Sequence, residues 1–114
     1  MHEASIAQSI LEVVSRQAEA GGYRKVTRIV IKVGYLSSVV PESLEFAFQA
    51  LSRGTIAEGA RLDIEEVPGE GRCRACGAVF PVDSFLCVCE RCGTCDVEVK
   101  GGDDLTLESM DVEA

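Results

Sequence analysis

All six cysteines of this 114-residue chain lie between positions 73 and 95. The chain begins Met1-His2-Glu3-Ala4, which lacks the basic and apolar stretches of a secretion signal. Closely spaced cysteines in a chain without such a signal typically bind metal rather than form disulfides. We therefore expect a cytoplasmic protein whose cysteine segment folds around a metal ion.

Four of these cysteines form two matching pairs. The sequence CRACG at 73–77 is followed by CERCG at 89–93, which begins twelve residues after Gly77. In each pair the spacing lets backbone amides turn back toward the thiolates, and the glycine accepts the positive φ of the turn. Four thiolates complete a tetrahedral zinc site and leave no open coordination position for catalysis. We therefore expect a structural Zn(II) ion held by Cys73, Cys76, Cys89 and Cys92.

Two further cysteines, Cys87 and Cys95, lie outside these pairs. Because Cys95 lies three residues after Cys92, the segment contains two overlapping CxxC registers. We prefer Cys89 with Cys92, since a glycine then follows the second cysteine of each pair. Cys87 and Cys95 are then either small packing residues or alternative zinc ligands that exchange onto the metal, so the register stays open.

The rest of the chain has the periodicities of a small mixed fold. Apolar residues recur at helical spacing over 5–20 and again after Pro41, where Gly54 closes the helix. Alternating patterns predict strands over 26–33, 61–67 and about 105–112. We expect an α+β fold in which two helices pack on one face of a three-stranded sheet, with an inserted zinc-ribbon module. The predicted domains are 1–69 with 102–114, and the insertion 70–101.

The same patterns predict which side chains face the core. On the first strand we place Thr27, Ile29, Ile31 and Val33 on one side, and on the second strand Leu62 and Ile64 point inward. The first helix presents an apolar face made by Ile6, Ala7, Ile10, Leu11, Val14 and Ala18, and the second by Leu44, Ala47, Phe48 and Leu51.

His2 is the only histidine in the chain. The amine of Met1, the backbone amides on both sides of the His2 Cα and the imidazole can lie in one plane around a metal ion. Such a tetragonal nitrogen set favours Ni(II) or Cu(II) over zinc. Glu3 is placed to accept a hydrogen bond from the imidazole or from neighbouring amides, or simply to favour the first helical turn.

The formal net charge of −8 argues against a nucleic-acid partner, because such proteins usually show a basic face. No apolar run approaches the roughly 18 residues of a membrane span. A zinc-ribbon adaptor for transcription or RNA complexes is the main alternative, and a thiol oxidoreductase is another. We find no base–nucleophile pair and no phosphate-binding glycine loop, so we expect a protein that is not an enzyme and has no catalytic residues.

Five motifs occur in a fixed order along the chain. They are Met1-His2-Glu3, VGYLS at 33–37, PESL at 41–44, the paired CxxC sequences, and GGDDL at 101–105. In this order and length they resemble the HypA/HybF family of hydrogenase nickel-incorporation proteins, along nearly the whole chain. The tripeptide and the paired CxxC are each common, but the combination is specific.

The resemblance implies a metallochaperone that hands Ni(II) to the [NiFe]-hydrogenase large-subunit precursor. It implies the GTPase HypB as partner, and some members of the family also serve urease maturation. The family's nickel site maps onto Met1, His2 and Glu3, and its zinc ligands map onto the paired cysteines. Many relatives carry histidines beside the cysteine pairs, whereas this chain has Ala78 and Gly93 there. We therefore expect no zinc-domain histidine at the nickel site.

Overall fold

The computed structural model describes residues 3–84 and 88–114. The chain folds into two compact units, and each is built from separate stretches of sequence. The first unit comprises Met1–Ile31, Val39–Glu65 and Thr106–Ala114, and the second comprises Lys32–Ser38 and Glu66–Leu105. In the part of the chain that the structure describes, no helix is long and apolar enough to cross a membrane.

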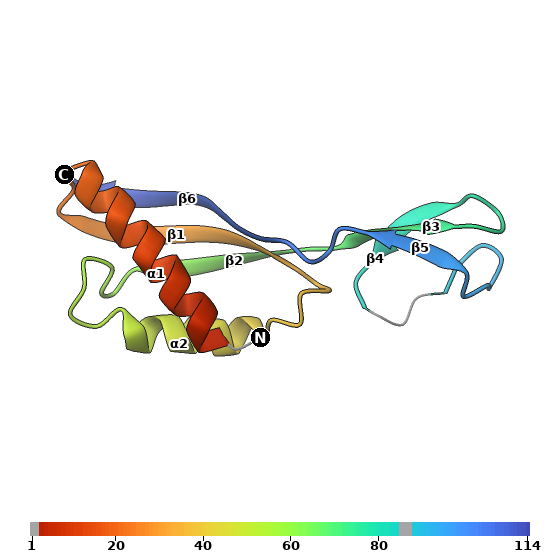
Figure 1. The fold of residues 1–114 in the computed structure, drawn as a ribbon, viewed down its shortest axis with the longest axis horizontal. Helices are drawn as coiled ribbons and strands as arrows, with labels where there is room; N and C mark the ends of the chain where they lie inside the picture. Colours follow the sequence, from red (N-terminus) through yellow and green to blue (C-terminus); the bar gives the residue numbers. More distant parts are fainter. Residues whose placement is uncertain (1–2, 85–87) are drawn as a thin grey trace. The chain divides into compact units, whose positions relative to one another are not determined.

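The first unit is a helix-covered sheet (Figure 1). Its sheet has the strand order β2-β1-β6, so the last strand of the chain pairs with the first. The elements are α1 (Glu3–Ala20), β1 (Lys25–Gly34), α2 (Pro41–Leu51), β2 (Arg61–Val67) and β6 (Leu105–Glu113). The α+β prediction, with two helices and a small three-stranded sheet, is confirmed.

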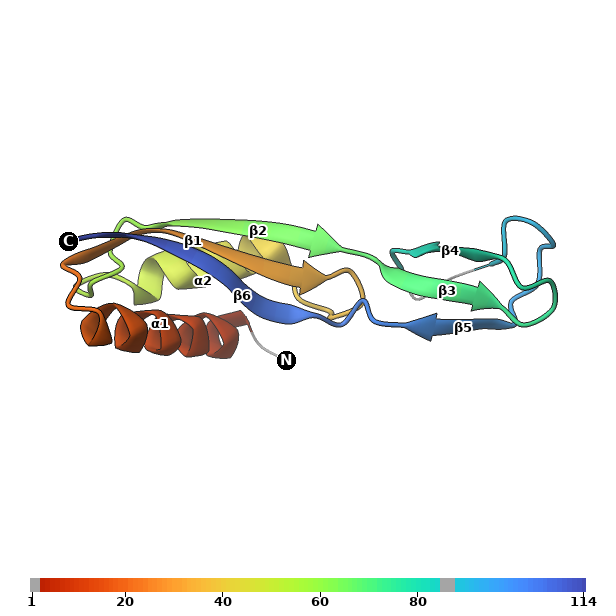
Figure 2. The same cartoon turned by 90° about the horizontal axis from the view of Figure 1, so that it is seen from above.

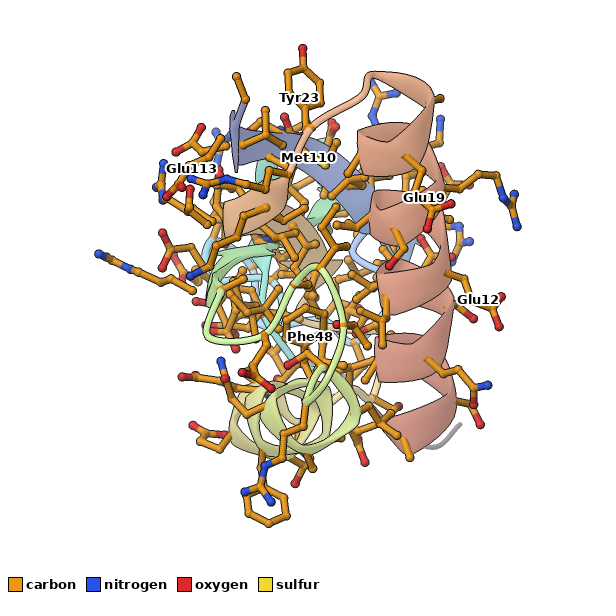
Figure 3. The ribbon with its side chains drawn as sticks, turned by 90° about the vertical axis from the view of Figure 1, so that its left-hand side faces the viewer. Glu12, Glu19, Tyr23, Phe48, Met110 and Glu113 are labelled. Carbon is orange, nitrogen blue, oxygen red and sulfur yellow. The ribbon has the colours of Figure 1, made fainter. Side chains whose placement is uncertain are left out.

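The core of this unit lies between the two helices and the sheet. Phe48 points from α2 into this layer, whereas Glu12 and Glu19 point outward from α1 (Figure 3). The buried residues of α1 recur at helical spacing, and they are Ile6, Ala7, Val14 and Ala18. Burial of one side chain as large as Phe48 contributes about 1.5–3 kcal/mol, so this aliphatic layer stabilises the unit without help from a metal.

The predicted alternation of β1 is wrong at its start. Thr27 is only half-buried, and two residues rather than one separate the first two buried positions of the strand. One extra residue in a strand produces such a slip, as in a β-bulge. The buried positions are Val26, Ile29, Ile31 and Val33. The Thr27 hydroxyl instead donates a hydrogen bond to the carbonyl of Asp111 at 3.2 Å.

Other inward-facing predictions are wrong or only partly right. Ile10 and Leu11 of α1 and Ala47 of α2 are half-buried rather than buried. Leu51, placed in the apolar stripe of α2, is 40% exposed because it lies in the last turn of the helix. Ile64 is half-buried, whereas Leu62 of the same strand is buried.

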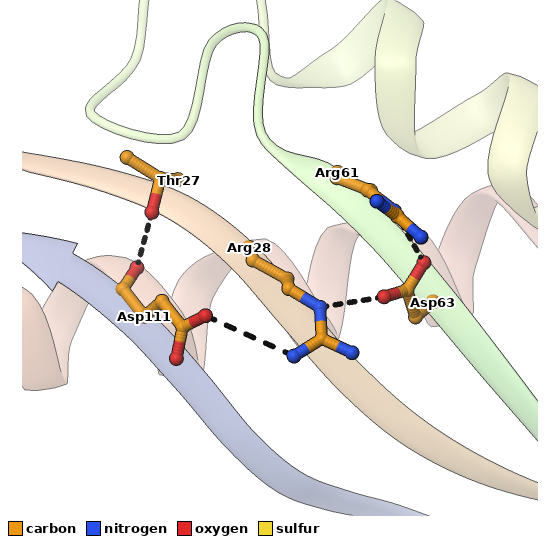
Figure 4. A network of polar contacts seen from close by, with 5 residues as sticks. All are labelled: Thr27, Arg28, Arg61, Asp63 and Asp111. Carbon is orange, nitrogen blue, oxygen red and sulfur yellow. Dashed lines mark hydrogen bonds and ion pairs between the residues drawn. The ribbon is translucent and has the colours of Figure 1, made fainter.

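Arg28 joins all three strands of this sheet (Figure 4). Its Nε donates to a carboxylate oxygen of Asp63 on β2 at 2.6 Å, and its Nη1 lies 3.8 Å from Asp111 on β6. Arg61 donates to the other oxygen of Asp63 at 2.8 Å. The helices lie behind the sheet in this view, so the network occupies the face that they leave open.

The second unit contains a smaller sheet. Its strands are β3 (Gly69–Cys73), β4 (Val79–Val82) and β5 (Val97–Lys100), none of which was predicted individually. Figure 2 shows β3 between the other two, and both pairings are antiparallel. A Cβ on Gly71 would lie 2.6 Å from Val82 and 3.0 Å from the Phe80 ring, so these side chains pack directly against the backbone of β3.

The loop after β1 belongs to this second unit. The Gly34 N–H donates to the carbonyl of Asp104 at 2.8 Å, and the Leu36 N–H donates to that of Gly102 at 2.6 Å. The Tyr35 N–H donates to the carbonyl of Val67 at 2.9 Å. The segments that enter and leave the cysteine module are therefore both bonded to this one loop.

Candidate metal centre

The first cysteine pair forms a tight turn at the end of β3. The Cys73 N–H donates to the carbonyl of Ala78, and the Gly77 N–H donates back to that of Cys73, both at 2.9 Å. Gly77 has φ +78°, a conformation that side chains other than glycine rarely adopt. The turn also aims the Cys76 N–H at the Cys73 sulfur, 3.4 Å away.

The second pair repeats this turn. The Cys89 N–H donates to the carbonyl of Thr94 at 2.9 Å, and the Gly93 N–H donates to that of Cys89 at 2.8 Å. Gly93 also has φ +78°. The matching glycines of the two sequences therefore have matching roles, because each lets its chain reverse immediately after the second cysteine.

The two turns bring four sulfurs together. All four lie within 4.8 Å of one another, and they belong to Cys73, Cys76, Cys89 and Cys92. Cys73 lies 3.5 Å from Cys92 and Cys76 lies 3.6 Å from Cys89, sulfur to sulfur. A tetrahedron with Zn–S bonds of about 2.3 Å has edges of about 3.8 Å, whereas a disulfide is about 2.05 Å long. The cluster therefore fits zinc.

Backbone amides prepare two of these thiols to ionise. The Cys76 amide, followed by that of Ala75, lowers the pKa of Cys73 to about 6 against the opposing effect of burial. The Cys92 amide lowers the pKa of Cys89 in the same way. The Thr94 amide lowers the pKa of Cys92, but the neighbouring thiols, first that of Cys73, and burial outweigh it and raise that pKa to about 12. Negative charges crowded this closely call for a cation between them.

Arg74 connects the turn of the first cysteine pair to β5 and to the residue just before it. Its N–H donates to the Asp96 carbonyl at 3.0 Å, and its guanidinium lies 2.8 Å from the Asp96 carboxylate and 3.8 Å from Glu98. The sequence carries no signal for this pairing, because the partners are more than twenty residues apart.

The other predicted site residues do not join this cluster. Cys95 is exposed and is not part of the four-sulfur group. Cys87, Met1 and His2 lie outside the described residues. Glu3 is the first residue of α1, and its carboxylate accepts a hydrogen bond from the Val40 N–H at 3.1 Å. Val40 is the N-cap residue of α2, so Glu3 satisfies the N–H that the N3 side chain bonds in a capping box.

The chain matches one known protein family along nearly all of its length. The family described as "Hydrogenase/urease nickel incorporation, metallochaperone, hypA" matches residues 1–112. The chain belongs to the HypA family. HypA proteins are maturation factors and metallochaperones, which confirms the prediction that the chain is not an enzyme.

Individual HypA proteins are similar over their full length. The hydrogenase maturation factor HypA of Chlorobaculum tepidum is 50% identical over 113 residues, covering 99% of this chain and 100% of that protein. The HypA of Geobacter sulfurreducens is 44% identical with the same coverage. The solution structure of the Ni metallochaperone HypA from Helicobacter pylori matches with a TM-score of 0.68 and 27% identity, covering 100% of this chain and 99% of that one.

Proposed function

We propose that this chain binds Ni(II) at its N-terminus and delivers it to the [NiFe]-hydrogenase large-subunit precursor. The proposed ligands are the amine of Met1, the imidazole of His2 and the backbone amides on either side of the His2 Cα, the second of which is the amide of Glu3. The proposal rests on membership of a nickel-incorporation family together with the position of Glu3 at the start of α1.

Glu3 is the first residue of α1. The hydrogen bonds within an α-helix use N–H groups only from the fifth residue onward, so they do not include the Glu3 amide. Deprotonating it for nickel therefore breaks no helical hydrogen bond. Two deprotonated amides also neutralise Ni(II), so the complex does not place net positive charge at the positive end of the helix dipole.

The Glu3 carboxylate has a supporting role in this proposal. Its hydrogen bond with the Val40 N–H ties the start of α1 to the start of α2. This bond holds the Glu3 backbone, and hence its amide nitrogen, in a constant position relative to the folded unit. The carboxylate therefore orients the site as an outer-shell group.

The other parts of the proposal follow the family. We propose that residues 1–69 and 102–114 form the nickel-binding domain, and that residues 70–101 form an inserted domain with a structural Zn(II). The GTPase HypB and the hydrogenase precursor are the proposed partners, with urease maturation proteins as further recipients. We place this activity in the cytoplasm, because clustered thiols that hold metal belong in a reducing compartment.

Three untagged proteins test the nickel site: the wild type, His2→Ala, and the wild type acetylated at the Met1 amine. His2→Ala removes the imidazole, and acetylation removes the amine as a ligand while keeping every side chain. Both changes are expected to weaken nickel binding at least tenfold by calorimetric titration. The wild-type complex should be yellow, diamagnetic and planar, and acid should weaken it because the amine and amides must lose protons.

Thermal unfolding serves as the control for this experiment, since both changes precede the first apolar turn of α1 and should leave stability unchanged. A zinc-ribbon adaptor would be indifferent to both. If the acetylated protein binds nickel as tightly as the wild type and with the same spectrum, the amine is not a ligand and the proposed site is wrong.

A further inference from the structure

The second cysteine turn carries a thiol that the four-sulfur cluster does not use. Cys95 lies three residues after Cys92, and its sulfur is not among the four that lie within 4.8 Å of one another. The first turn has no such thiol, because the residue three after Cys76 is Val79. The zinc site therefore leaves the CxxC spacing of Cys92 and Cys95 without a role.

Both thiols of this spare pair are open to solvent. Within the cluster Cys73 and Cys89 are buried, whereas Cys92 is exposed, and Cys95 outside the cluster is exposed as well. Cys76 is the other exposed member of the cluster, but no additional cysteine follows its turn. A small oxidant in solution therefore reaches two thiols, one a zinc ligand and one not, that are close neighbours along the chain.

The backbone between these two cysteines allows them to approach each other. Three residues span at most about 11 Å, and a disulfide requires Cα atoms roughly 4.4–6.8 Å apart. Gly93 lies between the two cysteines and is itself exposed, so the chain can rotate there without displacing a packed side chain. Only a local change of backbone conformation is needed to join the two sulfurs.

We propose that Cys92 and Cys95 form a redox switch, in which a peroxide converts the two thiols into a disulfide and the loss of Cys92 as a ligand releases the zinc. The proposal rests on the zinc register that excludes Cys95, and it is independent of the nickel site. Three thiolates remain after oxidation, and a module with so little apolar core depends on complete ligation to stay folded.

The chemistry takes place in two steps. Cys92 binds zinc as a thiolate, and its sulfur attacks one oxygen of hydrogen peroxide, so that the O–O bond breaks and hydroxide leaves to take a proton from solvent. The Cys95 sulfur then attacks the sulfenic acid formed on Cys92. The S–S bond forms, the S–O bond breaks, and the OH group leaves as water with the proton of Cys95. The two sulfurs lose two electrons in total, which reduce the peroxide to water.

Cys95 is the thiol available for the second step, although the Cys73 sulfur lies only 3.5 Å from that of Cys92. Cys73 is buried, accepts a hydrogen bond from the Cys76 N–H at 3.4 Å, and as a zinc ligand gives its lone pair to the metal. Attack by Cys73 would remove two zinc ligands, whereas attack by Cys95 removes only Cys92. A dithiol reductant reverses the product by thiol–disulfide exchange.

Zinc release and disulfide mapping of the full-length, nickel-free protein test the switch. Hydrogen peroxide is added in slight excess, zinc is followed with a chromogenic chelator against a peroxide-free baseline, and disulfides are identified by peptide mass spectrometry. The wild type should release its zinc with Cys92–Cys95 as the first disulfide, and dithiothreitol with added zinc should restore the site. Cys95→Ser should release zinc at least about tenfold more slowly, because it lacks the resolving thiol.

Cys87→Ser is the matched control, since it removes the other cysteine outside the cluster and should release zinc at the wild-type rate. All three proteins should contain one zinc per chain before oxidation. Loss of zinc from unoxidised Cys95→Ser would make Cys95 a ligand and overturn the proposal. It is also overturned if peroxide leaves the zinc in the wild type, if Cys95→Ser releases zinc as fast as the wild type, or if the first disulfide joins any other two cysteines.

Discussion

At the scale of single residues, the glycine after each cysteine pair allows the backbone turn that brings the cysteine sulfurs together. Gly77 and Gly93 share φ +78°, and each follows the second cysteine of a turn that donates amides to sulfur. Cys95 is followed by Asp96, and a residue with a Cβ adopts a positive φ less readily than glycine does. The overlapping register therefore lacks the residue that would close its turn.

The zinc register is predicted to follow these glycines. Cys87→Ser with Cys95→Ser should retain one zinc per chain, because neither thiol is needed for the four-sulfur cluster. Cys89→Ser should lose most of the zinc, since it removes one of the two buried thiols of that cluster. Elemental analysis after exhaustive dialysis measures both. Loss of zinc from the double variant, with full zinc in Cys89→Ser, would favour the Cys92/Cys95 register.

At the scale of secondary-structure elements, close backbone contacts and one charged network hold the strands in place. The loop after β1 approaches 101–104 so closely that a Cβ on Gly34 would lie 2.0 Å from the carbonyl oxygen of Gly102. In the larger sheet, Arg28 bonds to β2 and lies near a carboxylate of β6 from its place on β1. Each feature predicts a measurable effect.

Gly34→Ala is expected to destabilise the protein by about 2 kcal/mol or more, because overpacking of this kind forces the backbone to move. Gly59→Ala is the matched control. Gly59 has φ +75°, and a Cβ added there would meet no heavy atom within 4 Å, so only its left-handed backbone conformation is penalised, at about 1–2 kcal/mol. Urea unfolding of both variants makes the comparison, and equal or smaller loss in Gly34→Ala would contradict the close backbone contact.

Asp63 is expected to make stability depend on pH. Hydrogen bonds from Arg28, and then from Arg61, hold the pKa of Asp63 below its ordinary value. A depressed carboxyl pKa stabilises the fold above the unfolded-state value of about 3.9, and the stabilisation is lost as the pH falls through the folded-state pKa. The free energy of unfolding should therefore fall more steeply below about pH 4 in the wild type than in Asp63→Asn.

Urea titrations from neutral pH to pH 3 measure this difference, and any acid release of zinc affects both proteins equally. Glu65→Gln, an exposed acid on the same strand, is the control and should keep the wild-type slope. Parallel curves for the wild type and Asp63→Asn would show that the Arg28 network contributes nothing to acid sensitivity.

At the scale of the whole molecule, the two units depend on different forces. The first unit buries a layer of aliphatic and aromatic side chains that includes Phe48, Ile29 and Leu44. Between Glu66 and Leu105 the described buried apolar side chains are only Cys73, Val82 and Cys89, so two of the three belong to the thiol cluster. A module with so little core needs a metal to fold.

Metal removal is therefore predicted to unfold the second unit alone. Structural zinc contributes on the order of 10 kcal/mol to small folds, whereas the helices and the larger sheet keep their apolar layer without it. Amide exchange with and without chelator should show loss of protection in β3, β4 and β5 and retained protection in α1, α2 and β1. Circular dichroism should show the helical signal intact. Global unfolding would show that the two units are energetically inseparable.

Patterns among neighbouring residues are sufficient to predict the helices, most of the strands and the cysteine turns of this protein. Helical and alternating spacing located the five elements of the first unit, and β2 was placed at 61–67 as observed. The glycines after each CxxC pair indicated which cysteines the folded chain brings together. These inferences succeed because periodicity, turn conformation and ligand spacing depend only on residues that are neighbours along the chain.

Contacts between distant parts of the chain could not be predicted in this way. The altered alternation at the start of β1 depends on how that strand lies in its sheet. The Glu3–Val40 hydrogen bond and the Arg74–Asp96 pair join residues that are far apart in the sequence, so they depend on how helices pack and on strand register. The register between β3 and β5 likewise decides which N–H groups of β5 bond to β3, since a shift of one residue would exchange them with the outward-facing ones. Register is a property of two strands together, so neither segment's sequence specifies it alone.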